Sequence, residues 1–98
     1  MILQPNLFPG ISSWLGMVGQ RMRCELRLLQ RHDNESGYYR FLYIFVDPTG
    51  NSVVWKTEID KDLTIGDEFD ATFTVKSHGH FRGVRQTSLA RPRLRRKR

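Results

Sequence analysis

Residues 69–76, FDATFTVK, have the clearest structural pattern in the chain. Apolar residues at positions 69, 71, 73 and 75 alternate with polar residues at the positions that follow them. Because successive side chains of a β-strand point to opposite faces, this period of two predicts a strand with one buried and one exposed face. A sheet that buries one of its faces is therefore the starting interpretation of the fold.

Four other segments fit strands of the same sheet. Residues 20–28 alternate apolar with mostly charged side chains, and residues 82–90 show a weaker pattern, whose extension Pro92 should limit. Residues 38–46 and 52–57 are rich in aromatic and β-branched side chains and flank the turn DPTGN, which predicts a hairpin. Residues 77–81, SHGHF, lie between the strands predicted at 69–76 and 82–90 and are expected to form a loop.

Five strands without a convincing helical pattern predict an all-β protein. Closing a small sheet into a barrel removes its exposed edges. A five-stranded barrel of the oligonucleotide/oligosaccharide-binding (OB) type fits the strand count and the long first strand, and an SH3-like barrel is the alternative. We expect an irregular N-terminal arm over residues 1–19, an OB-like barrel over residues 20–91, and a disordered basic tail over residues 92–98.

The charges are distributed unevenly along the chain. The 98 residues include 16 Lys+Arg and 10 Asp+Glu, a formal net charge of +6. Residues 91–98, RPRLRRKR, hold six of the basic residues, which leaves ten basic and ten acidic residues before them. Residues 47–70 contain seven acids and two lysines, whereas all three charged residues in 71–90 are basic. This pattern excludes a uniformly basic domain and predicts a neutral barrel with a polarised surface.

Several classes of protein are disfavoured by the sequence. It has no apolar run long enough for a membrane span, and no signal peptide is expected. The single cysteine, Cys24, excludes an intrachain disulfide framework and suits a cytoplasmic location. His78 and His80 could supply two metal ligands, but no third is evident nearby, so we expect no metal or cofactor. With no catalytic motif or small-molecule site evident, we expect a non-catalytic protein.

Interleaved basic and aromatic residues favour binding of single-stranded nucleic acid, because cations follow the phosphates and rings stack on bases. The groove is predicted from one stretch of the chain: Lys76, His78, His80, Phe81, Arg82, Arg85 and Gln86. The predicted hairpin adds Tyr38, Arg40, Trp55 and Lys56. The basic tail adds Arg91, Arg93, Arg95, Arg96, Lys97 and Arg98. Of these residues, Tyr38, Trp55 and Phe81 are expected to stack on bases.

The segment 38–46, YYRFLYIFV, is apolar on both of its predicted faces. One face belongs to the core, and we expect the other to be covered by the N-terminal arm or by a partner, because large open apolar patches are uncommon on monomers. The arm itself should pack on the barrel or on a partner through Leu7, Phe8, Trp14 and Leu15. The alternative function is therefore a protein-interaction or assembly subunit of a nucleoprotein complex, with self-association through the arm.

Three stretches of the chain, VGQRMRCELRL, DPTGNSVVWKT and LTIGDEFDATFTVKSHGHFRGVRQTSLAR, together resemble a small OB-like domain of phage and bacterial DNA-metabolism proteins. The shared patterns are D-x-x-G-N-x-x-x-W at residues 47–55 and T-V-K-x-H-x-x-x-x-G-x-x-Q-T-x-L-x-R at residues 74–91. The resemblance covers about residues 16–91. It implies an OB-like fold and a role in DNA replication, either binding single-stranded nucleic acid or anchoring a larger protein.

Overall fold

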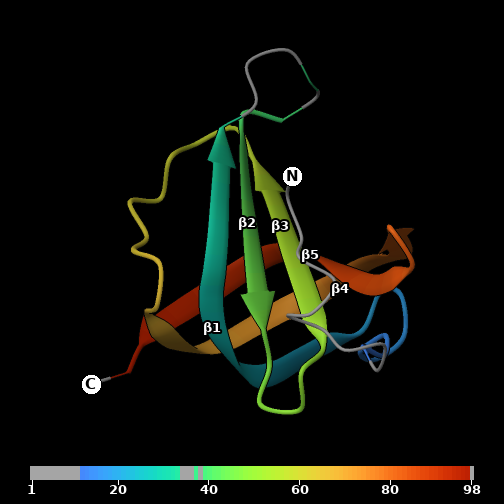
Figure 1. Ribbon diagram of the computed structural model, residues 1–98. Coiled ribbons are helices and arrows are strands. Elements are labelled where there is room, and N and C mark those ends of the chain that lie inside the picture. The colour runs from blue at the N-terminus through green and yellow to red at the C-terminus, as the bar shows by residue number, and fades with distance from the viewer. Residues whose placement is uncertain (1–11, 34–36, 38, 98) are drawn as a thin grey trace.

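Five strands form a closed barrel in the computed structural model, which describes residues 12–33, 37 and 39–97 (Figure 1). The strands are β1 (Arg21–Asp33), β2 (Phe41–Val46), β3 (Ser52–Thr57), β4 (Glu68–Phe81) and β5 (Val84–Arg96). Their order around the barrel is β1-β2-β3-β5-β4, and every neighbouring pair is antiparallel except β3 and β5. The prediction of an all-β, five-stranded OB-like barrel is confirmed.

The long first strand belongs to both halves of the barrel. Its beginning, from Arg21 to Arg27, pairs with β4, and its remainder pairs with β2. The register shifts between Leu28 and Gln30, and β1 curves visibly at the lower side of Figure 1. A β-bulge bends a strand in this way and lets one strand close the barrel.

The barrel interior is filled by the apolar faces that the alternation predicted. The largest fully buried side chains include Phe45, Phe69 and Phe73. A fully buried side chain of this size contributes about 1.5–3 kcal/mol relative to an exposed one. Outside this core, Leu42 and Ile44 of β2 form a second buried cluster with Val54 and Val84. The second apolar face of β2 is thus covered by the β4–β5 hairpin, through Val84 and Phe81, and among the described residues not by the arm or a partner as expected.

The expectation of a disordered tail over residues 92–98 is wrong for residues 92–96. β5 continues to Arg96 and pairs with the first half of β4, and Leu94 packs against the core. Pro92 does not stop the strand because the register is irregular there, and Arg91 adopts a positive φ of 49°. Irregular positions of this kind are where a sheet accepts proline. The final residue, 98, lies outside the described residues.

The expected loop at residues 77–81 is also a strand, since β4 runs to Phe81 and pairs with β5 up to the turn. Arg82 and Gly83 connect the two strands with φ values of 51° and 79°. Two successive residues with positive φ are the signature of a type I′ hairpin turn. The sequence pattern missed this strand because glycine and histidine are poor strand signals.

The described part of the N-terminal arm packs on the barrel, as expected for Trp14 and Leu15. Leu15 contacts the core, and its backbone N–H donates to Thr87 Oγ1 at 2.8 Å. The Ser12 hydroxyl donates to the Arg85 carbonyl at 2.7 Å and accepts from the Ser52 N–H at 2.9 Å, where β3 and β5 meet. Leu7 and Phe8 lie outside the described residues.

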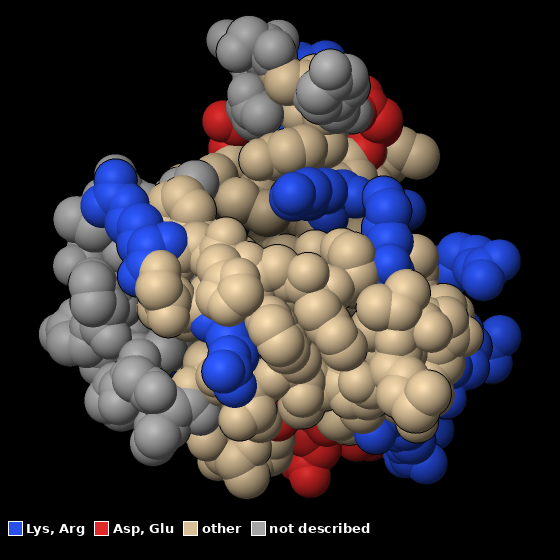
Figure 2. Space-filling model, turned by 90° about the vertical axis from the view of Figure 1, so that its right-hand side faces the viewer, with Lys and Arg blue, Asp and Glu red and all other residues tan. Residues whose placement is uncertain are grey.

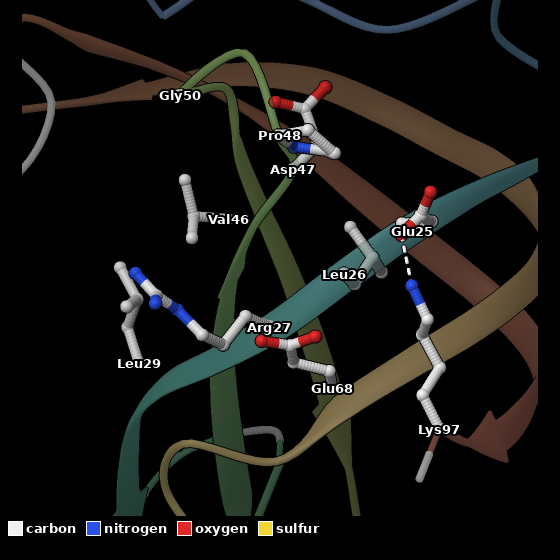
Figure 3. Close-up of a pocket in the computed structure, with 10 residues that line it drawn as sticks. All are labelled: Glu25, Leu26, Arg27, Leu29, Val46, Asp47, Pro48, Gly50, Glu68 and Lys97. Atoms are coloured by element: carbon white, nitrogen blue, oxygen red, sulfur yellow. Dashed lines mark hydrogen bonds and ion pairs between the residues drawn. The ribbon is translucent and has the colours of Figure 1, made fainter.

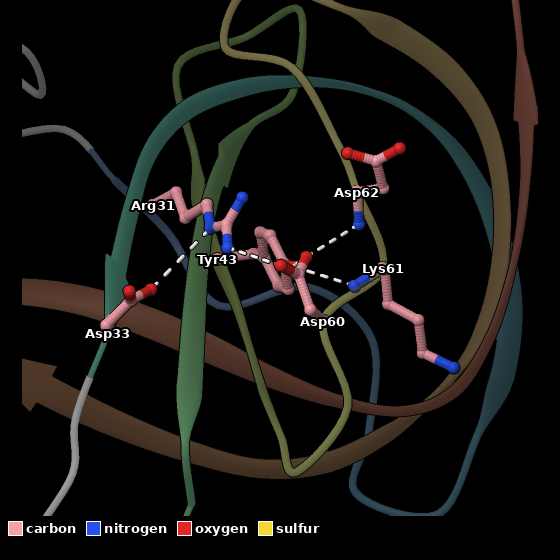
Figure 4. Close-up of polar contacts among 6 residues, drawn as sticks. All are labelled: Arg31, Asp33, Tyr43, Asp60, Lys61 and Asp62. Atoms are coloured by element: carbon pink, nitrogen blue, oxygen red, sulfur yellow. Dashed lines mark hydrogen bonds and ion pairs between the residues drawn. The ribbon is translucent and has the colours of Figure 1, made fainter.

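The β3–β4 connection, residues 58–67, occupies the position where many OB folds place a helix, but it is not helical here. The buried Tyr43 holds it in place, because its hydroxyl donates to Asp60 Oδ1 at 3.2 Å and accepts from the Lys61 N–H at 2.9 Å (Figure 4). Arg31 donates to the other Asp60 oxygen at 2.6 Å. The hydrogen bond from the Asp62 backbone N–H lowers the pKa of Asp60, and the hydrogen bond from Arg31 lowers it further. This carboxylate is therefore ionised at neutral pH.

Candidate nucleic-acid interface

The first candidate surface is the outer side of β1, β4 and β5. On β1, Arg21 and Arg23 are exposed, whereas the alternate residues Met22 and Cys24 pack against the core. The register places Arg23, Thr72 and Arg93 in one row across the three strands. With neighbouring strands about 4.8 Å apart, the backbones of the two arginines are about 10 Å apart. We use the name basic face for the exposed residues Arg21, Arg23, Lys76, Arg91, Arg93 and Arg95.

Hydrogen bonds hold the basic face together. Arg21 donates from Nη1 to the Arg91 carbonyl at 2.8 Å and to Thr74 Oγ1 at 3.2 Å. Arg23 lies 3.8 Å from the Asp70 carboxylate, which marks the acidic border of the face. These contacts join β1 to the last part of β5, so segments about 70 residues apart in the sequence form one surface.

A second surface lies next to it at the β4–β5 hairpin, where we define a Trp14 cluster of Trp14, His78, His80 and Arg85. The indole stacks on His78 with ring centroids 5.3 Å apart, meets His80 edge to face at 5.1 Å, and has the Arg85 guanidinium 4.9 Å from its centroid. His78 Nε2 donates to the Leu15 carbonyl at 3.1 Å. The arm thereby adds an aromatic ring, 37% of it exposed, to the predicted groove residues.

The remaining groove residues have different surroundings. Phe81 is half-buried and packs against the outer apolar cluster of β2, so little of its ring is available for stacking. Arg82 is exposed at the hairpin turn, with its guanidinium 5.4 Å from the Phe81 ring centroid. Gln86 is half-buried, and its side chain donates to Ser52 Oγ at 3.4 Å. The hairpin therefore presents cations at its tip and packed side chains along its inner side.

The residues predicted on the β2–β3 hairpin do not join these surfaces. Trp55 is half-buried against Tyr43, with ring centroids 5.7 Å apart, and the Lys61 ammonium lies over its ring. Lys56 lies over Tyr39, and Arg40 lies 5.9 Å from the centroid of the Phe41 ring. β3 meets β5 only through Ser52–Val54, and Trp55 and Lys56 come after this contact, away from the β4–β5 turn. Tyr38 lies outside the described residues.

The tail cations divide into two groups. Arg91, Arg93 and Arg95 belong to the basic face, where they are exposed. Arg96 forms an ion pair with Asp67 at 3.0 Å and lies over the Phe69 ring. Lys97 pairs with Glu25, and this hydrogen bond raises the pKa of the lysine. Three tail arginines are thus available to a ligand, and two tail cations form ion pairs inside the chain. Arg98 is outside the described residues.

Sequence reasoning missed Arg21, Arg23 and Trp14 as members of a binding surface. The alternation of Arg21 and Arg23 with apolar residues already placed them on the outer face of a strand. What the pattern does not contain is the pairing of this strand with β4, which brings them close to Arg93. Figure 2 shows the hairpin side of the molecule, where basic side chains are spread over a mostly uncharged surface and the visible acidic ones lie toward two margins.

A cleft of about 530 Å³ lies on another part of the surface, between β1, the β2–β3 turn and Lys97 (Figure 3). Of its three acids, Glu25, Asp47 and Glu68, the first two have partners inside the chain. Glu25 is bound to Lys97, and Asp47 Oδ1 accepts from the backbone N–H groups of Thr49 and Asn51 at 3.0 and 2.8 Å. Because Arg27 and Lys97 line the cleft together with these acids, its charge is mixed and not of one sign.

Within the described residues, no group of three or more His, Cys, Asp and Glu side chains is placed to hold a metal ion. Burial raises the pKa of the Cys24 thiol to about 11, so the thiol is protonated and a poor nucleophile at neutral pH. The described part of the chain has no helix long and apolar enough to cross a membrane. Comparison with protein-family models, curated proteins and solved structures finds no match to this chain.

Proposed function

We propose that this protein is a non-catalytic nucleic-acid-binding protein that prefers single strands and binds them on the basic face and the Trp14 cluster. The observation that supports this most strongly is the pairing of β1, β4 and β5, which brings Arg21 and Arg23 beside Arg93. From residue 71 to residue 97 the chain contains eight Lys and Arg and no acid. A surface of this charge attracts phosphates and releases their counterions.

The preference for single strands rests on the Trp14 cluster. An exposed indole beside Arg85 and His80 offers a partner for an unpaired base, and stacking of this kind contributes about 1–3 kcal/mol per base. A base in a duplex is already stacked and paired, so it would have to be unstacked first. The bound strand would follow β4 and β5. It would not follow the β2–β3 face, whose apolar side chains are packed inside the chain.

Binding of single-stranded DNA, single-stranded RNA and duplex, measured over a series of salt concentrations, tests the proposal. The double substitution Arg23→Ala/Arg93→Ala should weaken binding and lower the salt slope by about 1.4, because each lost phosphate contact lowers it by about 0.7. Arg40→Ala/Lys56→Ala is the matched control, since it removes two exposed cations where β2 begins and β3 ends, away from the proposed site. Absence of binding at low salt, or a larger effect of the control pair, contradicts the proposal.

A second candidate function is an interaction or assembly subunit of a nucleoprotein complex. The observation that favours it is the pair Ile59 and Ile65, each 62% exposed on the acidic connection between β3 and β4. Exposed apolar side chains mark protein contacts where they form one contiguous patch. If the chain associates with itself there, Ile59→Ser/Ile65→Ser will lower the mass measured by light scattering, whereas an unchanged mass contradicts self-association through this connection.

A further inference from the structure

Two of the most exposed apolar side chains lie side by side in the sequence, just before β1. Met17 is 73% exposed and Val18 is 62% exposed. Apolar residues at the tip of a turn are unusual, because turns that face water favour glycine, proline and small polar residues. Neither side chain contributes to the core, so their position calls for an explanation outside the fold.

The turn that presents them is firmly held. The Gln20 N–H donates to the Met17 carbonyl at 2.9 Å, and Gly19 between them has a φ of 92°, as the third position of a type II turn requires. The turn is attached to β4, because the Gly19 N–H donates to the Val75 carbonyl at 2.7 Å and the Val75 N–H donates to the Gln20 carbonyl at 2.8 Å.

Close packing under the turn adds to this rigidity. A side chain at Gly16 would bring its Cβ within 2.8 Å of Gln20 Oε1 and 3.0 Å of Met22 Sδ, and the φ of 59° there also favours glycine. The Gln20 side chain accepts from the Met17 N–H at 2.9 Å. The two apolar side chains therefore project from a preorganised support, which reduces the entropy lost when they contact a ligand.

Cations lie on both sides of the turn. Lys76 directly follows Val75, the β4 residue that binds the turn, and it is exposed. Arg21 directly follows Gln20 and reaches across to Thr74 and Arg91 on the basic face. A strand whose phosphates contact these cations passes close to the turn, within reach of Met17 and Val18.

We propose that Met17 and Val18 form an apolar wedge that inserts between neighbouring bases of the bound strand. Apolar wedges that unstack bases are an established device of nucleic-acid-binding proteins, and methionine is among the side chains used. The inference rests on the proposed function and adds to it a point of base contact. It agrees with the preference for single strands, because separating two neighbouring bases there disturbs one stack, whereas in a duplex the wedge must also unstack the opposite strand and kink the helix.

The test uses the full chain and an oligodeoxyadenylate that contains one 2-aminopurine, whose fluorescence is quenched by its stacked adenine neighbours and rises when the base is unstacked. Binding of the unsubstituted protein should raise this fluorescence for a defined position of the probe. Met17→Ser/Val18→Ser should abolish the rise and weaken binding roughly tenfold, about the effect of losing one stacked base. The salt slope should not change, because no cation is removed. Met17→Leu should preserve both signals.

Ile59→Ser/Ile65→Ser is the matched control, because it removes two apolar side chains of comparable exposure from an acidic setting. The wedge is overturned if the unsubstituted protein binds tightly without a change in fluorescence, or if both double variants lose fluorescence and affinity equally. Either result leaves the proposed function intact. Absence of binding by every variant removes the proposed function itself. Binding to phosphatidylserine vesicles but not to the oligonucleotide, lost in Met17→Ser/Val18→Ser, assigns the turn to an anionic membrane and also overturns the wedge.

Discussion

The basic face and the acidic connection between β3 and β4, residues 58–67, use their charges in different ways. In the connection, Asp60 binds Arg31 and Tyr43, and Asp67 binds Arg96, so these charges stabilise the fold. On the basic face, the ion pairs found among the described residues include Arg23 but not Arg93 or Arg95. Charge that is paired inside the chain supports structure, and charge left exposed is available for a ligand.

Exposed apolar residues sharpen the same comparison. Met17 and Val18 stand among cations, and Ile59 and Ile65 stand among acids, with similar exposure in three of the four positions. Hydrophobicity is thus shared by the two regions, and the surrounding charge distinguishes them. An anionic polymer should discriminate between the two regions, whereas an uncharged apolar partner should not.

The largest expected effect comes from removing residues 91–98, because β5 then loses its second half. The truncated chain loses the burial of Leu94, the ladder to the start of β4 and the ion pair of Arg96 with Asp67. We expect the free energy of unfolding to fall by about 3 kcal/mol. The half-buried Leu94 contributes less than the roughly 1.5–3 kcal/mol of a fully buried side chain, and the lost strand pairing supplies the rest. Urea unfolding followed by circular dichroism measures this change.

The control for the truncation is Arg93→Ala/Arg95→Ala in the full chain. It removes two exposed cations of the basic face and leaves the strand in place, so its free energy of unfolding should stay within about 0.5 kcal/mol of the unsubstituted protein. Its affinity for nucleic acid should nevertheless fall. A truncated protein as stable as the full chain would show that this segment is only a charged appendage.

A smaller effect is expected at Asp60, where the lowered pKa links stability to pH. A carboxylate with a folded-state pKa below its unfolded value stabilises the protein above the unfolded pKa, and this contribution is lost as the pH falls through the folded pKa. Asp60→Asn should therefore be less stable than the unsubstituted protein at neutral pH, and the difference should shrink below the ordinary aspartate value of 3.8.

Asp62→Asn is the control for Asp60→Asn. Asp62 donates to the Asp60 carboxylate through its backbone N–H, and this hydrogen bond is retained when the side chain is changed. Urea unfolding of both variants over a pH series separates the two positions. A difference between Asp60→Asn and the unsubstituted protein that does not change with pH would mean that the side-chain geometry, and not the charge, holds the connection in place.

Local patterns were sufficient for most strands and insufficient for their lengths. The alternation from Phe69 to Val75 identified both the strand and its buried face, and the turn at residues 47–51 identified the β2–β3 hairpin. The same reasoning ended β5 too early, because it treated Pro92 as a stop. A proline is compatible with a strand where a bulge removes the need for its N–H, and the bulge depends on the partner strand.

The candidate site shows the same division. His78, His80 and Arg85 were identified from composition, and the structure groups them. Trp55 was expected to stack on a ligand, but it is half-buried against Tyr43. Its neighbours in the sequence are polar and apolar in equal measure, so the pattern did not show which side of the hairpin would line the barrel.

The sequence by itself determined the approximate strand segments, the faces that the alternating strands β1 and β4 bury, and the separation of acidic from basic blocks, because these depend on residues that are close together in the chain. Only the tertiary structure decided that Arg21 and Arg23 lie beside Arg93, that Trp14 rests on His78, and that the tail is a strand. These features depend on how the barrel closes, and closure is set by contacts between segments that are tens of residues apart.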